Sequence, residues 1–304
     1  MRIRGRTFFL GILLACCLTG SGLHAQNEST TIDTTIPLEQ RIVETPASVL
    51  RPIRAHLEPH TLSVAERDKV IKALAALPAF ETNALAAHVR SISFVEGRVT
   101  NGMTIPLATP SGTIYDIVIH ASVLDETVSA FFTRKEQGCY RASTSGETIA
   151  IEAGSQDAVL YVLLHEAMHV VDGIPPVQST AAYTTPRSLA ADIWNDSLTV
   201  NPPYRSPFLE GACFRTGTPG SMDNAQDTYK ALQSSPFASL YGSKNWYDDS
   251  AELVALYHLT QVLHEPYRIT LRTQEQTILS IEPMSSPTVQ RRFSAVKALY
   301  QQKS

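Results

Sequence analysis

Charge of one sign and long apolar runs are both scarce in this chain of 304 residues. Its 25 Lys and Arg residues face 29 Asp and Glu residues, which leaves a formal net charge of −4. Without a basic excess to hold phosphates, we expect no nucleic acid among its partners. The one strongly apolar run, residues 8–18, is too short to cross a bilayer as a helix, so no transmembrane span is expected.

Residues 1–25 have the pattern of a secretory signal peptide. Arg2, Arg4 and Arg6 precede the apolar run, and a small residue, Ala25, stands at a suitable cleavage position. Cleavage there removes three Arg and no acidic residue, which changes the net charge from −4 to −7. The expected location is therefore secreted or periplasmic.

Residues 13–16 give a second interpretation of the N-terminus. Their sequence, Leu-Leu-Ala-Cys, resembles a bacterial lipobox, in which Cys16 would carry a lipid anchor. Leu at the second position is unusual there, and Cys17 makes the register ambiguous. Simple cleavage is the preferred interpretation, and both place the protein outside the cytoplasm.

Cysteine is also scarce, since only Cys139 and Cys213 remain after residues 1–25 are removed. An even pair in an oxidising compartment can form one disulfide. Two separate buried thiols would fit the sequence equally well.

The order of expected elements indicates an α+β fold with one main domain, residues 59–304, after a polar linker or arm at 26–58. A small sheet precedes a central apolar helix, with Ser155 as its expected N-cap. Residues 173–224 hold seven of the 18 prolines and predict an irregular segment that forms a cleft wall or lid. The other expected elements are helices at 63–77, 249–265 and 287–302, strands at 91–95 and 113–123, and a hairpin of 139–142 with 148–152.

The central helix carries the most informative motif, His165-Glu166-Ala167-Met168-His169. Residues four apart share a helix face, so both imidazoles can reach one Zn²⁺. Glu166 stands where it can accept a proton from a zinc-bound water. Apart from these three side chains, residues 159–171 are uncharged, and buried polar groups without partners are costly. The motif therefore predicts a catalytic zinc site, with a purely structural helix as the alternative.

A catalytic zinc needs a third protein ligand. Asp172 and Pro175 stand where the metzincin pattern requires Gly and His, which excludes that class. Ala251-Glu252-Leu253-Val254-Ala255, together with the first motif and Asp172, resembles the protease domain of anthrax lethal factor and related bacterial gluzincin peptidases. The resemblance extends over roughly residues 60–302 in element order, but over only two helices in motif.

This resemblance implies a zincin-like fold with His165, His169 and Glu252 as zinc ligands and Glu166 as general base. It implies that Asp172 orients a ligand imidazole from outside the ligand set. It also implies that a tyrosine stabilises the oxyanion. Tyr241-Gly242 has the family's dipeptide, about four residues further upstream of Glu252 than in lethal factor, so Tyr247 is a rival.

The assignment of Glu252 has a competing interpretation. Asp249 and Glu252 have the spacing of a capping box, which would turn Glu252 outward at a helix start. The rival third ligands are Asp172, Glu210, His258 and His264.

The sequence thus predicts an exported zinc metallopeptidase, a hydrolase that acts on peptide or protein substrates. The alternative is a non-catalytic protein with a zincin fold, or a structural surface lipoprotein, that serves as a binding protein.

Overall fold

The computed structural model describes residues 32–50, 57–97, 100–142, 146–173, 189–273 and 276–302. The expected signal segment and Cys16 lie outside these ranges, as do 174–188 of the expected irregular segment. Within the described residues, no single helix has the length and apolarity to cross a membrane, although the bent pair of helices Val64–Ala75 and Ala79–His88 passes that test together.

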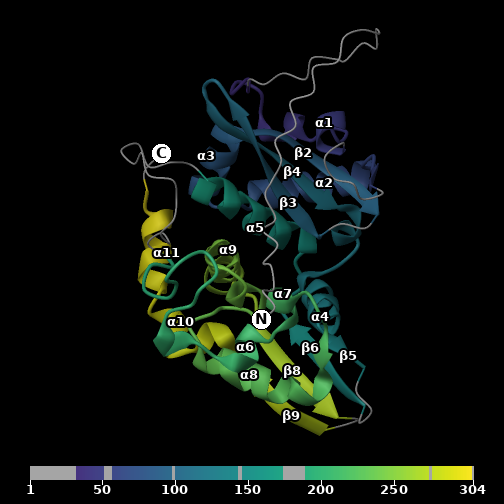
Figure 1. Ribbon diagram of the computed structural model, residues 1–304. Helices are drawn as coiled ribbons and strands as arrows, with labels where there is room; N and C mark the ends of the chain where they lie inside the picture. Colours follow the sequence, from purple (N-terminus) through teal and green to yellow (C-terminus); the bar gives the residue numbers. More distant parts are fainter. Residues whose placement is uncertain are drawn as a thin grey trace, which may run out of the picture.

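Helices and strands are mixed along the chain, which is consistent with the α+β class (Figure 1). The helices are α1 Ala47–Leu50, α2 Val64–Ala75, α3 Ala79–His88, α4 Val128–Gln137, α5 Ala158–Gly173, α6 Pro207–Glu210, α7 Cys213–Thr216, α8 Ala225–Ser234, α9 Trp246–Tyr257, α10 Pro287–Gln290 and α11 Phe293–Tyr300. The strands are β1 Leu57–Pro59, β2 Val89–Gly97, β3 Gly102–Thr109, β4 Gly112–His120, β5 Tyr140–Arg141, β6 Glu147–Glu152, β7 Gly220–Ser221, β8 Arg268–Thr273 and β9 Gln276–Ile281.

The N-terminal part of the chain contains a four-stranded sheet with the strand order β1-β2-β4-β3. Strands β2 and β4 are parallel, whereas β1 and β3 run antiparallel to their neighbours. Alternate residues of β2 face opposite sides. Ile92 and Phe94 join the main core, while Val95 packs under α1 with Val49 and Val118.

Helix α5 is the centre of the molecule (Figure 1). It contacts α2, α3 and β3 on the side of the first sheet, and α9 on the side of the C-terminal half. Nearly all its side chains are buried, as the uniform apolar sequence around the motif predicts. Its first residue is Ala158, so Ser155 is not its N-cap, contrary to expectation.

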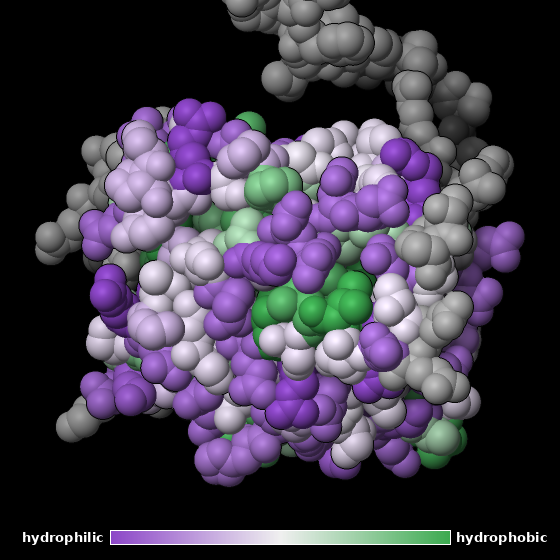
Figure 2. Space-filling view, turned by 90° about the horizontal axis from the view of Figure 1, so that it is seen from below, coloured by the Kyte–Doolittle hydropathy of each residue, from purple (hydrophilic) through white to green (hydrophobic). Residues whose placement is uncertain are grey.

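The expected hairpin of 139–142 with 148–152 is wrong. Strand β5 pairs with β7 in parallel, and β6 pairs with β8 in an antiparallel sheet ordered β6-β8-β9. Ile149 and Ile151 of β6 do alternate into the core, but the partner strand lies far along the chain. Seen from the side where this sheet lies, the surface is mostly hydrophilic, with a compact apolar patch near its centre and smaller apolar areas elsewhere (Figure 2).

The C-terminal helices also differ from expectation. The expected helix at 249–265 starts earlier, with Asn245 as its N-cap, and ends in a π-helical turn, His258–Val262. The expected helix at 287–302 is split into α10 and α11. The expected strand at 113–123 ends at His120. Helix α2 is as predicted, with a capping box between Ser63 and Glu66.

The described part of the 26–58 segment packs against the domain. Leu38 and Ile42 are buried in the main core, and Ile42 forms a bridge to Ile92 of β2. Arg41 is buried as well, and its guanidinium donates to the carbonyl oxygens of Ala86 and Val89 at 2.9 and 2.6 Å. Residues around 38–50 are therefore held by the fold rather than detached from it.

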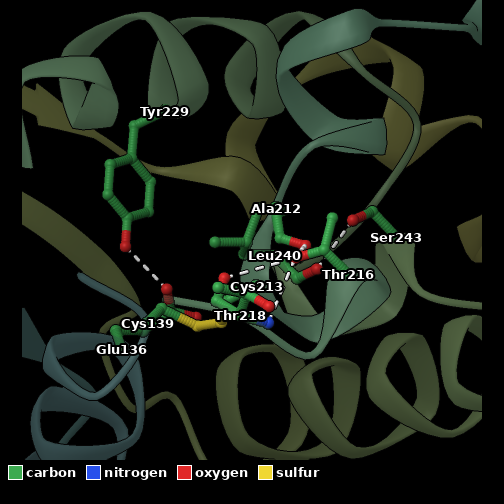
Figure 3. The surroundings of a disulfide bond; sticks show 9 residues. All are labelled: Glu136, Cys139, Ala212, Cys213, Thr216, Thr218, Tyr229, Leu240 and Ser243. Carbon is green, nitrogen blue, oxygen red and sulfur yellow. Dashed lines mark hydrogen bonds between the residues drawn. A yellow bond between two sulfur atoms is a disulfide. The ribbon is translucent and has the colours of Figure 1, made fainter. Parts of the chain in front are cut away.

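Cys139 and Cys213 form a disulfide, with a Cα–Cα distance of 5.2 Å (Figure 3). The bond joins the end of α4 to the start of α7, 74 residues later. Beside it, Tyr229 of α8 donates a hydrogen bond of 2.6 Å to Glu136. The sequence left pairing and separate thiols equally open, and the structure supports pairing.

Glu136 predicts a measurable pH dependence of stability. Burial raises its pKa from 4.5 to about 7, although the Tyr229 hydrogen bond opposes the shift. Because the folded state holds the extra proton, this contribution to the free energy of unfolding is complete below about pH 4.5 and disappears as pH rises through 7. Glu136→Gln should remove this pH-dependent change in the free energy of unfolding, which totals about 3 kcal/mol. Urea unfolding of both proteins between pH 4 and 8 measures it, and parallel curves would contradict the assignment.

Candidate metal centre and active site

The motif residues of α5 converge as predicted. His165 and His169 stand one turn apart, and their Nε2 atoms are 3.1 Å from each other. His165 is buried, and the side chain of His169 is 22% exposed. One face of α5 thus presents two imidazole nitrogens to one point, the arrangement that a shared metal ion requires.

The carboxylate beside both Nε2 atoms belongs to Asp248, in the first turn of α9. Its Oδ1 atom lies 3.5 Å from His165 Nε2 and 3.6 Å from His169 Nε2. The three ligand atoms all lie within 4.8 Å of one another. The second oxygen, Oδ2, is occupied by Lys244 Nζ at 2.8 Å and by the Asn245 amide at 2.7 Å. These contacts leave Oδ1 directed at the histidines.

Glu252, the expected third ligand, lies one turn further along α9. It is fully buried, so the outward capping box is excluded, and Asn245 caps the helix instead. Its Oε1 atom is 3.1 Å from His165 Nδ1, the ring nitrogen on the opposite side from the Asp248 contact. Tyr161 and Ser239 also donate hydrogen bonds to this carboxylate. The structure thus brings Glu252 to the outer nitrogen of a ligand imidazole rather than into the group of three.

The other candidate ligands lie elsewhere. Glu210 forms an ion pair with Arg205 at 2.8 Å, and His258 Nδ1 lies 3.0 Å from the hydroxyl of Tyr300. His264 follows the π-helical turn after α9. Asp172 is buried in the last turn of α5, and its predicted role in orienting a ligand imidazole stays a prediction.

Opposed charges dominate the electrostatics of this group. Burial disfavours a charged His165, but the neighbouring carboxylates of Asp248 and Glu252 outweigh it and raise the His165 pKa to about 9. Although burial opposes this, the two histidines hold the pKa of Asp248 well below its usual range. A proton on His165 therefore satisfies the carboxylates when no metal does so. A metal ion must displace that proton, so its affinity should fall as pH falls.

The donor set fits a zinc ion. Two neutral imidazoles and one carboxylate are the protein ligands of many catalytic zinc sites, which leave a further position for water. The same set also binds Fe(II) in some oxygenases. The neighbouring Glu166 favours the hydrolytic metal, because zinc hydrolases of this motif use such a carboxylate as base.

Glu166 is held between α5 and the edge strand β3. Thr104 donates to Glu166 Oε2 at 2.7 Å and lies 3.0 Å from its backbone oxygen. The other oxygen, Oε1, approaches Gly102 so closely that a Cβ there would lie only 2.5 Å away. Glycine at 102 is therefore required by the position of the carboxylate.

A pocket of about 220 Å³ opens beside Glu166 and His165. Tyr241 lines it, with its ring centroid 5.7 Å from that of His165 and its hydroxyl 3.2 Å from Lys244 Nζ. Tyr247 is 37% exposed and stacks on Trp246 at 3.9 Å. Of the two candidate tyrosines, the structure brings Tyr241 to the pocket.

Within the ranges that the structure describes, no strand pairs with the outer edge of β3 beside this pocket. The backbone of His120 donates to Asn101 at 3.0 Å, and bonded pairs alternate along antiparallel strands. Gly102 and Thr104 therefore turn their backbone polar groups away from β4. The backbone of Pro106 also faces away from β4, so its lack of an N–H group removes no hydrogen bond from the sheet.

Sequence reasoning missed Asp248, Lys244 and Lys135 as parts of this site. Asp248 and Glu252 are four residues apart and share one helix face. This spacing is a signal that could have identified Asp248 as a second candidate for the third ligand. Lys135 comes from α4, far from both motifs, and no local pattern indicated it.

Comparisons with known proteins found no relatives. No protein-family model matches this chain, and no curated protein or solved structure matches it significantly.

Metal analysis of point variants tests the site. The wild-type protein should carry about one zinc per chain, and His165→Ala, His169→Ala and Asp248→Ala should each lose it. Glu252→Ala should keep the three ligands but weaken affinity by roughly 10- to 100-fold, because a ligand imidazole loses its orienting carboxylate. Elemental analysis and chelator competition measure both quantities.

Glu210→Ala is a matched control for this experiment, because it removes a carboxylate outside the group and should leave zinc unchanged. Loss of zinc in Glu252→Ala together with full zinc in Asp248→Ala would instead make Glu252 the ligand. Iron in place of zinc would refute the choice of metal.

Proposed function

We propose that the protein is an exported zinc-dependent peptidase of zincin type, with His165, His169 and Asp248 as metal ligands and Glu166 as general base. The observation that carries the proposal is the convergence of these ligand atoms next to a pocket that both His165 and Glu166 line. A zinc ion bound there would lower the pKa of a water molecule and polarise the scissile carbonyl.

The resemblance to lethal factor supports Asp248 as the third ligand. Measured from Glu252, the Tyr241-Gly242 dipeptide stands about four residues too far upstream for that family. Asp248 is four residues before Glu252, so the discrepancy disappears when Asp248 is the ligand. Glu252 then takes the role of a carboxylate behind a ligand imidazole, which fixes the tautomer and the orientation of the ring.

Each protein group has one task in the proposed hydrolysis. Glu166 Oε1 accepts the proton of the attacking water and later delivers it to the nitrogen of the leaving amine. The Tyr241 hydroxyl donates a hydrogen bond to the oxygen that becomes negative as water adds. Lys244 contacts both Tyr241 and Asp248, so it holds the donor and the third ligand in a fixed relation.

The substrate is proposed to be an extended peptide beside β3. The outward backbone groups of Gly102 and Thr104 can pair with an added strand, a common mode of peptide recognition. The other edge strand to consider for this part is the one at 147–152. That strand, β6, lies in the other sheet and contributes no residue to the pocket beside Glu166.

Two further features support the location and the activity. The disulfide agrees with an oxidising compartment, as the proposed export requires. A binding protein without catalysis would have no need of a general base, yet Glu166 has a dedicated hydrogen-bond donor in Thr104 and a glycine that makes room for it.

Glu166→Gln separates catalysis from metal binding. The amide cannot accept the proton, so peptide cleavage should fall at least about 100-fold, while zinc content stays near one per chain. Cleavage of a peptide library, with and without chelator, measures the activity. Chelator-resistant cleavage, or full activity in Glu166→Gln, would contradict the proposal.

Tyr241→Phe and Tyr247→Phe form a matched pair. Loss of the Tyr241 hydroxyl removes an oxyanion donor and should lower kcat roughly 100-fold with little change in KM. Tyr247→Phe should leave kcat within about twofold, because its ring stacks on Trp246 outside the pocket. The reverse result in steady-state kinetics would assign the role to Tyr247.

A further inference from the structure

We propose that the pocket beside Glu166 binds an acidic side chain of the substrate, and that Lys135 recognises its carboxylate. This inference rests on the peptidase function proposed above and adds the chemical class of the residue next to the scissile bond.

The position of the pocket indicates which part of a substrate enters it. Tyr161 and Val162, about one turn before His165 on α5, line it. His165 and Glu166 line it as well. A side chain that fills this pocket therefore belongs to a residue directly beside the bond that Glu166 would help to cleave.

Most of the pocket wall is aromatic. Phe131 of α4, Tyr161 of α5, Phe214 of α7 and Tyr241 surround the space. Such walls keep water away and weaken dielectric screening, so one charge among them acts strongly. The ammonium group of Lys135 supplies a positive charge to this lining, and the carboxylate of Glu166 lines the pocket as well.

Lys135 is placed inside this aromatic enclosure. Its side chain is only 10% exposed, and Nζ lies 3.7 Å from the centroid of the Tyr241 ring. It donates one hydrogen bond, of 3.3 Å, to the Tyr161 hydroxyl. An ammonium group has three donors. Among the described residues no second hydrogen-bond acceptor is found for it, so Lys135 retains donors for a ligand.

Glu252 forms an ion pair with Lys135 but occupies none of the hydrogen-bond donors of the ammonium group. Its Oε1 atom is 3.9 Å from Lys135 Nζ, too far for a hydrogen bond. The carboxylate already accepts hydrogen bonds from Tyr161 and Ser239, and it contacts His165. With a divalent cation bound nearby, the surroundings of the pocket favour an anionic group over a neutral one and repel a cationic one.

Paired peptide substrates test the inference. Each peptide carries Glu, Gln, Leu or Lys at one of the two residues that flank the cleaved bond and is otherwise identical to the others. The kcat/KM values of these peptides are compared at each of the two positions. At one of the two positions, wild-type kcat/KM should be roughly tenfold or more higher for Glu than for Gln, the effect of one charge-assisted hydrogen bond. Lys should be the poorest substrate. Equal rates for Glu and Gln at both positions would overturn the inference without any variant.

Variants then identify the recognising group. Lys135→Met should bring the Glu-to-Gln ratio of kcat/KM close to one, and Lys135→Arg should retain a preference for Glu. The ratio within each variant is the readout, so a general loss of activity cancels. Lys230→Met, which removes an exposed ammonium on α8, is the control and should keep the wild-type ratio. A wild-type ratio in Lys135→Met would show that Lys135 is only a counter-ion of Glu252.

Binding measurements cover the case in which a variant loses turnover. Zinc-loaded Glu166→Gln should bind the Glu peptide roughly tenfold more tightly than the Gln peptide, as measured by calorimetry. The same ratio measured in Glu166→Gln/Lys135→Met should approach one. If wild-type protein cleaves no peptide at all, the proposed function fails. If it cleaves peptides without acidic preference, only the present inference fails.

Discussion

Two pairs of side chains, each spaced four residues apart, face each other between α5 and α9. One pair is His165 and His169, and the other is Asp248 and Glu252. Each pair lies on one helix face, so packing the two helices together buries two carboxylates against two imidazoles. Buried charges are tolerated only when they are paired, and removal of one partner leaves the others uncompensated. The site is therefore stable as a group, with a proton or a metal ion completing it.

A second buried ion pair sets the rotation of α9. Asp249 follows Asp248 directly and points to another side, where Arg292 donates to its two oxygens at 2.8 and 2.9 Å. Trp194 donates to the same carboxylate at 2.8 Å. Because neighbouring helix residues differ by about 100° in direction, fixing Asp249 this way directs Asp248 toward the histidines. The C-terminal segment around Arg292 thus helps to position Asp248, the proposed metal ligand, without touching it.

The parts of the site that lie within one helix could be predicted from sequence. The spacing of His165, Glu166 and His169 is decided by α5 alone, and the structure agrees with it. The third ligand depends on how α9 is rotated against α5, which no local pattern encodes, so Glu252 and Asp248 could not be distinguished. The capping-box pattern at Asp249 misled for a related reason, since Asn245 is an equally good cap and comes first.

The same distinction holds for the fold. Helix α2, the position of β2 and the alternation of β6 follow from local sequence patterns and were predictable. The partner of β6 was not, because strand pairing depends on contacts across the whole chain, and here the partner, β8, lies more than a hundred residues later. The break between α10 and α11 has a tertiary contact beside it, since Arg292 there binds the backbone of Leu189 and Pro236.

The last constraint joins the two halves at the general base. Glu166 is carried by α5, but its direction is set from β3, where Thr104 binds one carboxylate oxygen and Gly102 makes room for the other. In any other residue at 102, the Cβ atom would lie only 2.5 Å from Glu166 Oε1, so the carboxylate would have to turn away from the pocket. The same stretch of β3 turns its backbone groups outward, where a substrate strand would lie. In the proposed hydrolysis, one short segment of the edge strand would both fix the base and present the surface for the peptide, which would tie the position of the reacting bond to the position of the proton acceptor.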